Sequence, residues 1–118
     1  VFGVTQDAAI AALDNADELI PAQNEIFNRR KAFISDALTD LNIPLEPIEG
    51  GIFGWIKVPD GFNGESFTKY LLKEQSILVT PGKPFGSRAE DYIRISLAVD
   101  DQDLTAFTKR LAEIKNLW

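Results

Sequence analysis

The chain has 118 residues, of which 45% are hydrophobic and 25% charged, and this composition is typical of one globular domain. Its net charge of -6, with no basic cluster beyond Arg29-Arg30-Lys31, argues against a nucleic-acid or anionic-membrane surface. Because cysteine and histidine are both absent, the sequence excludes disulfides, thiolate chemistry, Ser-His or Cys-His catalysis and imidazole metal sites.

The first forty residues predict two helices. A short alanine-rich helix begins after Thr5, which is its expected N-cap, and breaks at Asn15-Ala16-Asp17. A long helix is expected to begin around Pro21 and to run to about Leu41, with Asn42 as its C-cap. Helical periodicity places one set of mostly apolar residues on a single face of the long helix. This set is Ile26, Phe27, Arg30, Phe33, Ile34, Ala37, Leu38 and Leu41.

The rest of the chain predicts three strands and two further helices. Alternation, turn residues and caps give an extended linker at 44–51, strands at 52–58, 76–80 and 92–98, and a helix at 66–75. A last helix, capped by Asp100-Asp101, carries Leu104, Phe107, Leu111 and Ile114 to the end of the chain. The predicted fold class is therefore α+β, a two-layer sandwich in which amphipathic helices cover a small, mostly antiparallel three-stranded sheet.

Two local patterns resemble catalytic or phosphate-binding motifs. Ser66-Phe67-Thr68-Lys69 fits S-x-x-K, but the companion S-D-N and K-T-G patterns are absent, so we interpret it as a helix start with a solvated lysine. Gly82 and Gly86 lack the Gly-Lys-Ser/Thr ending of a phosphate loop and precede a strand, so we interpret them as turn glycines.

Charged clusters are interpreted as solvated helix surfaces. One or two members of Arg29-Arg30-Lys31 are expected to face solvent on a helix, so the triplet predicts a charged helical face. Asp100, Asp101 and Asp103 lie in the first turn of a helix, where the helix dipole stabilises them without a metal. No metal site is predicted.

Arg94 is the most informative residue, because it lies in the middle of the apolar strand Tyr92-Ile93-Arg94-Ile95-Ser96-Leu97-Ala98. Its guanidinium cannot lose its proton, so it needs a carboxylate, a phosphate or access to water. An edge-strand arginine whose head reaches solvent is one explanation. The other is an anion-binding site beside Tyr92 and Ser96, reached through a Pro-Gly loop that contains Phe85.

Several motifs together resemble the C-terminal portion of class I/II pyridoxal-phosphate aminotransferases, in the family's order and over essentially the whole chain. They are Gln6-x-Ala8-Ala9-x-x-Ala12-Leu13, Arg29-Arg30, Gly50-Gly51-Ile52-Phe53-Gly54-Trp55, Leu71-Leu72, Ile77-Leu78-Val79-Thr80-Pro81-Gly82, Phe85-Gly86 and Tyr92-Ile93-Arg94-Ile95-Ser96-Leu97-Ala98. Lys31 departs from the family, in which an aspartate is common after the arginine pair.

The resemblance implies the small domain of a fold-type-I enzyme that exchanges an amino group between an amino acid and a 2-oxo acid, with pyridoxal 5'-phosphate as cofactor. It implies that Arg94 binds the substrate α-carboxylate and that Phe53 and Phe85 line the pocket. It also implies a linker and short helix from the large-domain side at 1–20, the small domain at 21–118, docking to the large domain, and a homodimer of the whole protein.

The residues that the family uses for cofactor chemistry are not matched in this sequence. No lysine lies in the family's Schiff-base motif, and the aspartate and phosphate-binding groups that hold the cofactor belong to the large domain. We therefore expect no catalytic, cofactor-binding or metal-binding residue here, and we expect the chain alone to bind no cofactor stably and to transaminate nothing. The lack of methionine and the start at Val1 favour a piece of a longer protein.

Two alternatives stay open at this stage. Related fold-type-I lyases perform C–S cleavage or β-elimination with the same carboxylate arginine, and a free-standing amino-acid-binding module would also lack the lysine motif. Against the free-standing module, the first strand and the alanine-rich helix are expected to leave an apolar patch where a larger domain docks. No apolar run spans a membrane and no signal peptide is visible, so a cytoplasmic location is expected.

Overall fold

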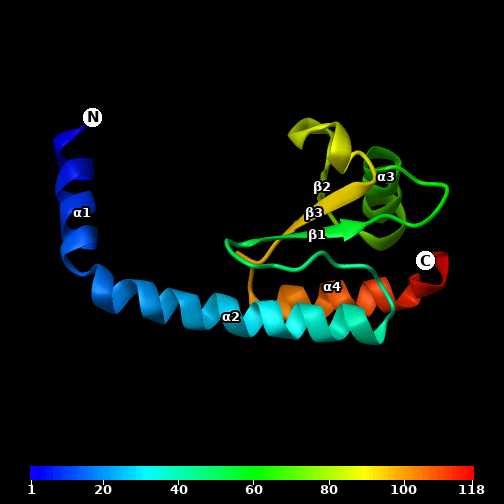
Figure 1. Cartoon of the computed structure of the whole chain (residues 1–118), viewed down its shortest axis with the longest axis horizontal. Coiled ribbons are helices and arrows are strands. Elements are labelled where there is room, and N and C mark those ends of the chain that lie inside the picture. The colour runs from blue at the N-terminus through cyan, green and yellow to red at the C-terminus, as the bar shows by residue number, and fades with distance from the viewer.

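The computed structural model describes residues 1–118 and has the predicted order of helices and strands (Figure 1). The elements are α1 (Gly3–Asp14), α2 (Ala16–Asp40), β1 (Phe53–Lys57), α3 (Gly64–Gln75), β2 (Thr80–Pro81), β3 (Tyr92–Ser96) and α4 (Asp101–Glu113), with 3-10 turns at Lys83–Phe85, Ser87–Ala89 and Lys115–Leu117.

The sheet has three antiparallel strands in the order β1-β3-β2, so the strand that carries Arg94 is the central one. In its register, Arg94 lies opposite Trp55 of β1 and Thr80 of β2. The predicted class, an α+β fold with a small antiparallel sheet covered by helices, is confirmed. The interpretation of Arg94 as an edge-strand residue is wrong.

One hydrophobic core lies between the sheet and the helices. Fourteen buried apolar side chains form it, with Ile56 of β1, Ile93 and Ile95 of β3, Phe67 of α3 and Leu111 of α4 among them. In Figure 1, α2 and α4 run side by side along one face of the sheet, and contacts between these two helices agree with the view. The alternation of β3 therefore leaves Tyr92, Arg94 and Ser96 on the face away from this core.

The two N-terminal helices begin earlier than predicted. α1 begins after Phe2, and Thr5 lies inside it rather than capping it. The break is a single residue, Asn15, because α2 begins at Ala16 and passes through Pro21. The proline ring removes only the hydrogen bond to the carbonyl of Asp17, and the helix continues with one bond fewer.

The C-terminal end of α2 is close to the prediction. The helix ends at Asp40, and Asn42 adopts the left-handed φ of 56°. The amide of Ile43 then donates to Leu38 O at 2.9 Å and the amide of Asn42 to Thr39 O at 3.0 Å, which is a Schellman motif with Asn42 as the residue after the cap.

The middle strand prediction at 76–80 is mostly wrong. Ser76 is left-handed (φ 52°), Ile77 turns into the core, and Leu78 is 80% exposed. Pairing with β3 begins only at Thr80 and includes Pro81, which is tolerated because β2 is an edge strand. The strands predicted at 52–58 and 92–98 are present but shorter, and they comprise Phe53–Lys57 and Tyr92–Ser96.

Candidate anion-binding site

The open face of the sheet carries the candidate site. Alternation along β1 turns Phe53 and Trp55 outward while Gly54 and Ile56 are buried. The pairing of Trp55 with Arg94 therefore places two aromatic residues of β1 beside the outward arginine of β3.

Two aromatic rings pack against the guanidinium of Arg94. Its central carbon lies 4.0 Å from the ring centroid of Phe53 and 4.3 Å from that of Phe85. Phe85 is held in turn by Trp55, with the ring centroids 5.4 Å apart in an edge-to-face arrangement. Cation–π contacts of this kind contribute about 0.5–1 kcal/mol at exposed sites.

The guanidinium N–H donors of Arg94 have no acceptor within the chain. Arg94 takes part in none of the chain's ion pairs, and aromatic rings do not satisfy the in-plane donors of a guanidinium. The rings orient the group while its donor edge stays free. This arrangement is suited to a planar anion such as a carboxylate.

Arg94 faces a groove of about 490 Å³ that lies between the 76–80 segment, β3 and the first turns of α4. A second arginine of this groove, Arg110, donates to the carbonyl oxygens of Gln75 (3.1 Å) and Ser76 (3.0 Å), so it is already engaged with the backbone. Arg94 is therefore the cation of the groove that is available to a ligand. Asp103 also lines this groove but forms no ion pair with Arg94.

A tight loop delivers Phe85 to the site. Gly82 donates its amide to Tyr92 O at 2.8 Å, and a Cβ at this position would collide with the backbone carbonyl of Ala89. Gly86 has a φ of 132°, which other residues rarely adopt. The interpretation of Gly82 and Gly86 as turn glycines is confirmed.

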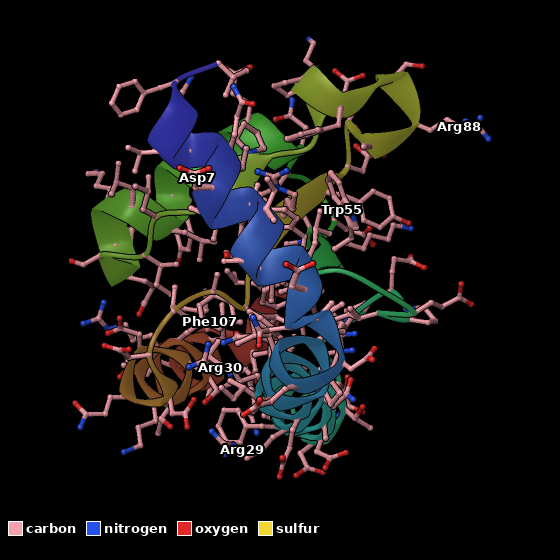
Figure 2. The ribbon with its side chains drawn as sticks, turned by 90° about the vertical axis from the view of Figure 1, so that its left-hand side faces the viewer. Asp7, Arg29, Arg30, Trp55, Arg88 and Phe107 are labelled. Carbon is pink, nitrogen blue, oxygen red and sulfur yellow. The ribbon has the colours of Figure 1, made fainter.

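A second groove, of about 540 Å³, is lined by Phe85 and Trp55 but not by Arg94. There the hydroxyl of Tyr92 donates to Glu46 Oε1 at 3.0 Å, and this hydrogen bond, with some desolvation, raises the pKa of Tyr92. Figure 2 shows Arg88 pointing outward at the edge of the molecule, away from Trp55.

The structure brings the three residues expected at the site, Arg94, Phe53 and Phe85, into direct contact. Trp55 was not among the site residues predicted from the sequence, although it lies two residues after Phe53 in β1 and therefore on the same face of the sheet. The S-x-x-K pattern is a helix start, as expected, because Ser66 belongs to the N-terminal capping box of α3.

The charged clusters were only partly predicted. Asp100 is the N-cap residue of α4 but makes no side-chain capping bond, whereas Asp101 binds both Arg29 and Arg30. Arg29 is 64% exposed and Arg30 only 17%, which fits the expectation that one or two members of the basic triplet face solvent and that Arg30 lies on the mostly apolar face of α2. No cluster of three or more histidine, cysteine, aspartate or glutamate side chains could hold a metal ion. None of the helices combines the length and the apolar character that a membrane crossing needs.

The model of the family described as aminotransferase class I and II matches residues 1–111. The chain therefore belongs to the class I and II aminotransferase family, in agreement with the resemblance found in its motifs.

Individual relatives and structures agree with the family. The LL-diaminopimelate aminotransferase of Maridesulfovibrio salexigens is 34% identical over 114 residues, which are 97% of this chain and 29% of that protein. The LL-diaminopimelate aminotransferase of Aquifex aeolicus is 33% identical over 97% of this chain and 30% of its own length. A solved aminotransferase structure from Staphylococcus aureus superposes with a TM-score of 0.96 at 42% identity, covering 100% of this chain and 31% of that one. The chain thus spans about 30% of the length of these relatives.

Proposed function

We propose that this chain is the small domain of a pyridoxal-phosphate-dependent aminotransferase and that Arg94 binds the α-carboxylate of its amino-acid and 2-oxo-acid substrates. One observation carries the proposal: the guanidinium of Arg94 is packed against Phe53 and Phe85, opens onto a groove and has no acidic partner of its own. The family supplies the reaction class, and the site supplies the group that would recognise its substrates.

The planar guanidinium of Arg94 is better suited to binding a carboxylate than a compact ammonium group, such as that of lysine, would be. A guanidinium donates two parallel N–H bonds to the two oxygens of a carboxylate, and each charge-assisted bond contributes about 1.5–3 kcal/mol net. Phe53 and Phe85 restrict the rotation of the group before the substrate arrives, so less conformational entropy is lost on binding. The groove itself takes its apolar lining from other residues, among them Leu78, Val99 and Phe107.

The residues of this chain do not fit the cofactor. A lysine that forms an imine with a carbonyl needs a pKa lowered by burial or a neighbouring cation. Here Lys31 is half-buried and every other lysine is exposed, and several pair with glutamates, as Lys69 does with Glu65 at 2.9 Å. We propose that the cofactor is held by the part of the full-length protein that this chain does not include, so no chemical step is assigned to these residues.

We further propose that residues 1–20 form the linker from the large domain and 21–118 the small domain. In support, every buried side chain of the core lies between Ile34 and Ile114, whereas α1 buries none. The large apolar side chains at 1–20 are exposed, which is expected of a surface that packs on another domain. The partners we propose are the substrates, the large domain and a second copy of the whole protein.

The test is Arg94→Ala in the full-length protein. We expect kcat/KM for amino-acid donors, LL-diaminopimelate included, to fall by about 10- to 10²-fold, because one or more charge-assisted bonds to the carboxylate are lost. Arg94→Lys keeps the charge but loses the two parallel N–H donors of the guanidinium, so we expect it to recover only part of the lost kcat/KM.

Arg88→Ala is the matched control, because Arg88 is exposed, lies in the loop that carries Phe85 and points outward (Figure 2). Its kcat/KM should equal that of the parent protein. Unchanged kinetics in Arg94→Ala would remove Arg94 from the proposed role, and a full-length protein without 2-oxo-acid-dependent amino transfer would overturn the proposed reaction.

A further inference from the structure

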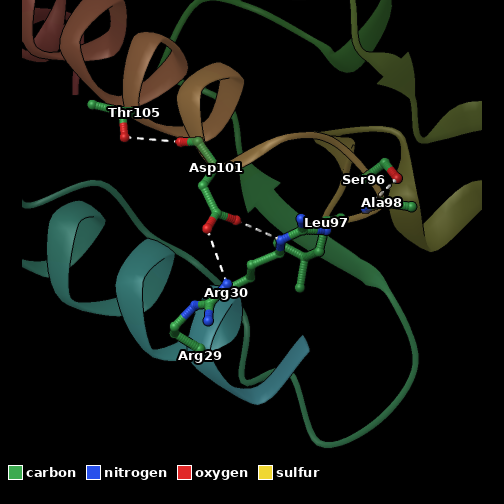
Figure 3. Close-up of polar contacts among 7 residues, drawn as sticks. All are labelled: Arg29, Arg30, Ser96, Leu97, Ala98, Asp101 and Thr105. Carbon is green, nitrogen blue, oxygen red and sulfur yellow. Dashed lines mark hydrogen bonds and ion pairs between the residues drawn. The ribbon is translucent and has the colours of Figure 1, made fainter. Parts of the chain in front are cut away.

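Arg30 of α2 joins three elements at one point (Figure 3). Its Nε donates to Asp101 Oδ1 of α4 at 2.8 Å, and its Nη1 donates to the carbonyl oxygen of Leu97 at 2.9 Å. Leu97 directly follows β3, three residues after Arg94. We call Arg30, Asp101 and Leu97 the Arg30 clamp.

The clamp fixes both strands that carry the candidate site. Leu97 is fully buried, and its amide donates to the carbonyl of Ile52 at 2.8 Å, directly before Phe53. Its two backbone groups thus connect α2 on one side and the start of β1 on the other. A shift of Leu97 would therefore move Arg94 and Phe53 together.

The burial of Arg30 shows that this contact is not a chance surface pair. Its side chain is 17% exposed, and a guanidinium removed from water is stabilised only when its donors are satisfied. Both named donors are satisfied, one by the half-exposed carboxylate of Asp101 and the other by the carbonyl of the buried Leu97. Neighbouring Arg29 binds the other oxygen of Asp101 at 3.0 Å, yet it is 64% exposed and makes no bond to Leu97.

We propose that Arg30 is a positioning residue, which holds the Leu97 carbonyl against α2 and α4 and thereby sets the place of Arg94 for carboxylate binding. This inference rests on the proposed function. Only two residues of β3, Ile95 and Ser96, separate Arg94 from Leu97, so the extended backbone carries a displacement of Leu97 to Arg94. A misplacement of about 1 Å can cost up to about 10²-fold in rate.

The experiment compares the full-length protein with its Arg30→Gln, Asp101→Asn, Arg29→Gln and Arg94→Ala variants. Each is assayed with a donor amino acid and with its α-carboxamide, in single turnovers so that slow reactions are resolved. The measured quantity is the ratio of kcat/KM for the acid to that for the amide. Because the amide has nearly the same shape but no charge, this ratio reports how strongly the enzyme recognises the carboxylate group.

We expect the acid-to-amide ratio to fall roughly tenfold in Arg30→Gln and less in Asp101→Asn, and to stay unchanged in Arg29→Gln. Asp101→Asn keeps the shape of an exposed side chain and provides a folded variant should Arg30→Gln be unstable.

An unchanged acid-to-amide ratio in both clamp variants, whether or not kcat/KM falls equally for the two substrates, would overturn the positioning role. A ratio that also survives Arg94→Ala would instead show that the proposed carboxylate site itself is wrong.

Discussion

At the scale of single residues, the arginines of this chain differ in what their guanidinium groups contact. Arg29 and Arg30 bind Asp101, Arg110 binds backbone carbonyls of the segment after α3, and Arg94 is packed only against aromatic rings. A guanidinium carries its charge at any physiological pH, so the absence of an acidic partner around Arg94 leaves a charge available to a ligand.

Asp101 predicts a pH dependence of stability. The hydrogen bond from Arg30, and then the charges of Arg29 and Arg30, lower the pKa of Asp101 below its ordinary value. A carboxyl whose pKa is lower in the folded state stabilises the fold above its unfolded pKa and loses this contribution as the pH falls through the folded pKa. We therefore expect the free energy of unfolding to decline below about pH 4.

Urea unfolding at several pH values, with Asp101→Asn for comparison, measures this effect. The asparagine variant should be less stable at neutral pH and should show a shallower acid decline. Glu65, whose pKa is lowered by its hydrogen bond from Lys69, contributes to the acid decline of both proteins. Parallel pH curves for the two proteins would contradict the assignment to Asp101.

At the scale of elements, α3 is determined mainly by its own sequence. The side chain of Asn63 accepts from the amide of Ser66 at 2.8 Å, and the hydroxyl of Ser66 accepts from the amide of Asn63 at 3.0 Å. This reciprocal pair satisfies two backbone donors at the start of the helix. It also explains why the helix begins at Gly64, two residues before the predicted start.

Removing this cap should destabilise the chain measurably. We expect Asn63→Ala to lower the free energy of unfolding by about 0.5–2 kcal/mol, because an amide at the helix start loses its acceptor. Asn63→Asp is the matched control, since its carboxylate accepts the same bond and lies favourably at the N-terminal end of the dipole. Equal losses in the two variants would show that the cap is not the source of the effect.

At the scale of the whole molecule, the chain is more extended than a compact domain. Its radius of gyration is 16.9 Å and its longest extent is 50 Å. A globular chain of this length should have a radius of gyration of about 13.5 Å. Figure 1 shows the cause, because α1 and the first half of α2 project away from the sheet. Apolar side chains such as Val4, Ile10 and Leu13 are more than half exposed there.

Because α1 buries no residue, deleting residues 1–14 should hardly affect the stability of the remainder. We expect the free energy of unfolding of the shortened chain to agree with that of residues 1–118 within about 0.5 kcal/mol. Trp118→Ala is the contrasting change at the other terminus, because Trp118 packs on Phe67 at 5.3 Å and donates to Lys57 O at 2.8 Å. It should cost more than about 1 kcal/mol. If deleting residues 1–14 lowered the free energy of unfolding as much as Trp118→Ala does, the view that α1 contributes little to the stability of the rest would be wrong.

The sequence by itself determined the order of the elements, the fold class, the alternation of β3 and the outward direction of Arg94, because these follow from local periodicity and turn chemistry. Only the tertiary structure placed β3 in the centre of the sheet and reduced the 76–80 segment to two paired residues. Only the tertiary structure, too, shows that Trp55 packs against Phe85 and that Arg30 contacts Leu97. The physical reason is that strand pairing and arginine partners join residues far apart in the chain, and local patterns carry no information about those distances.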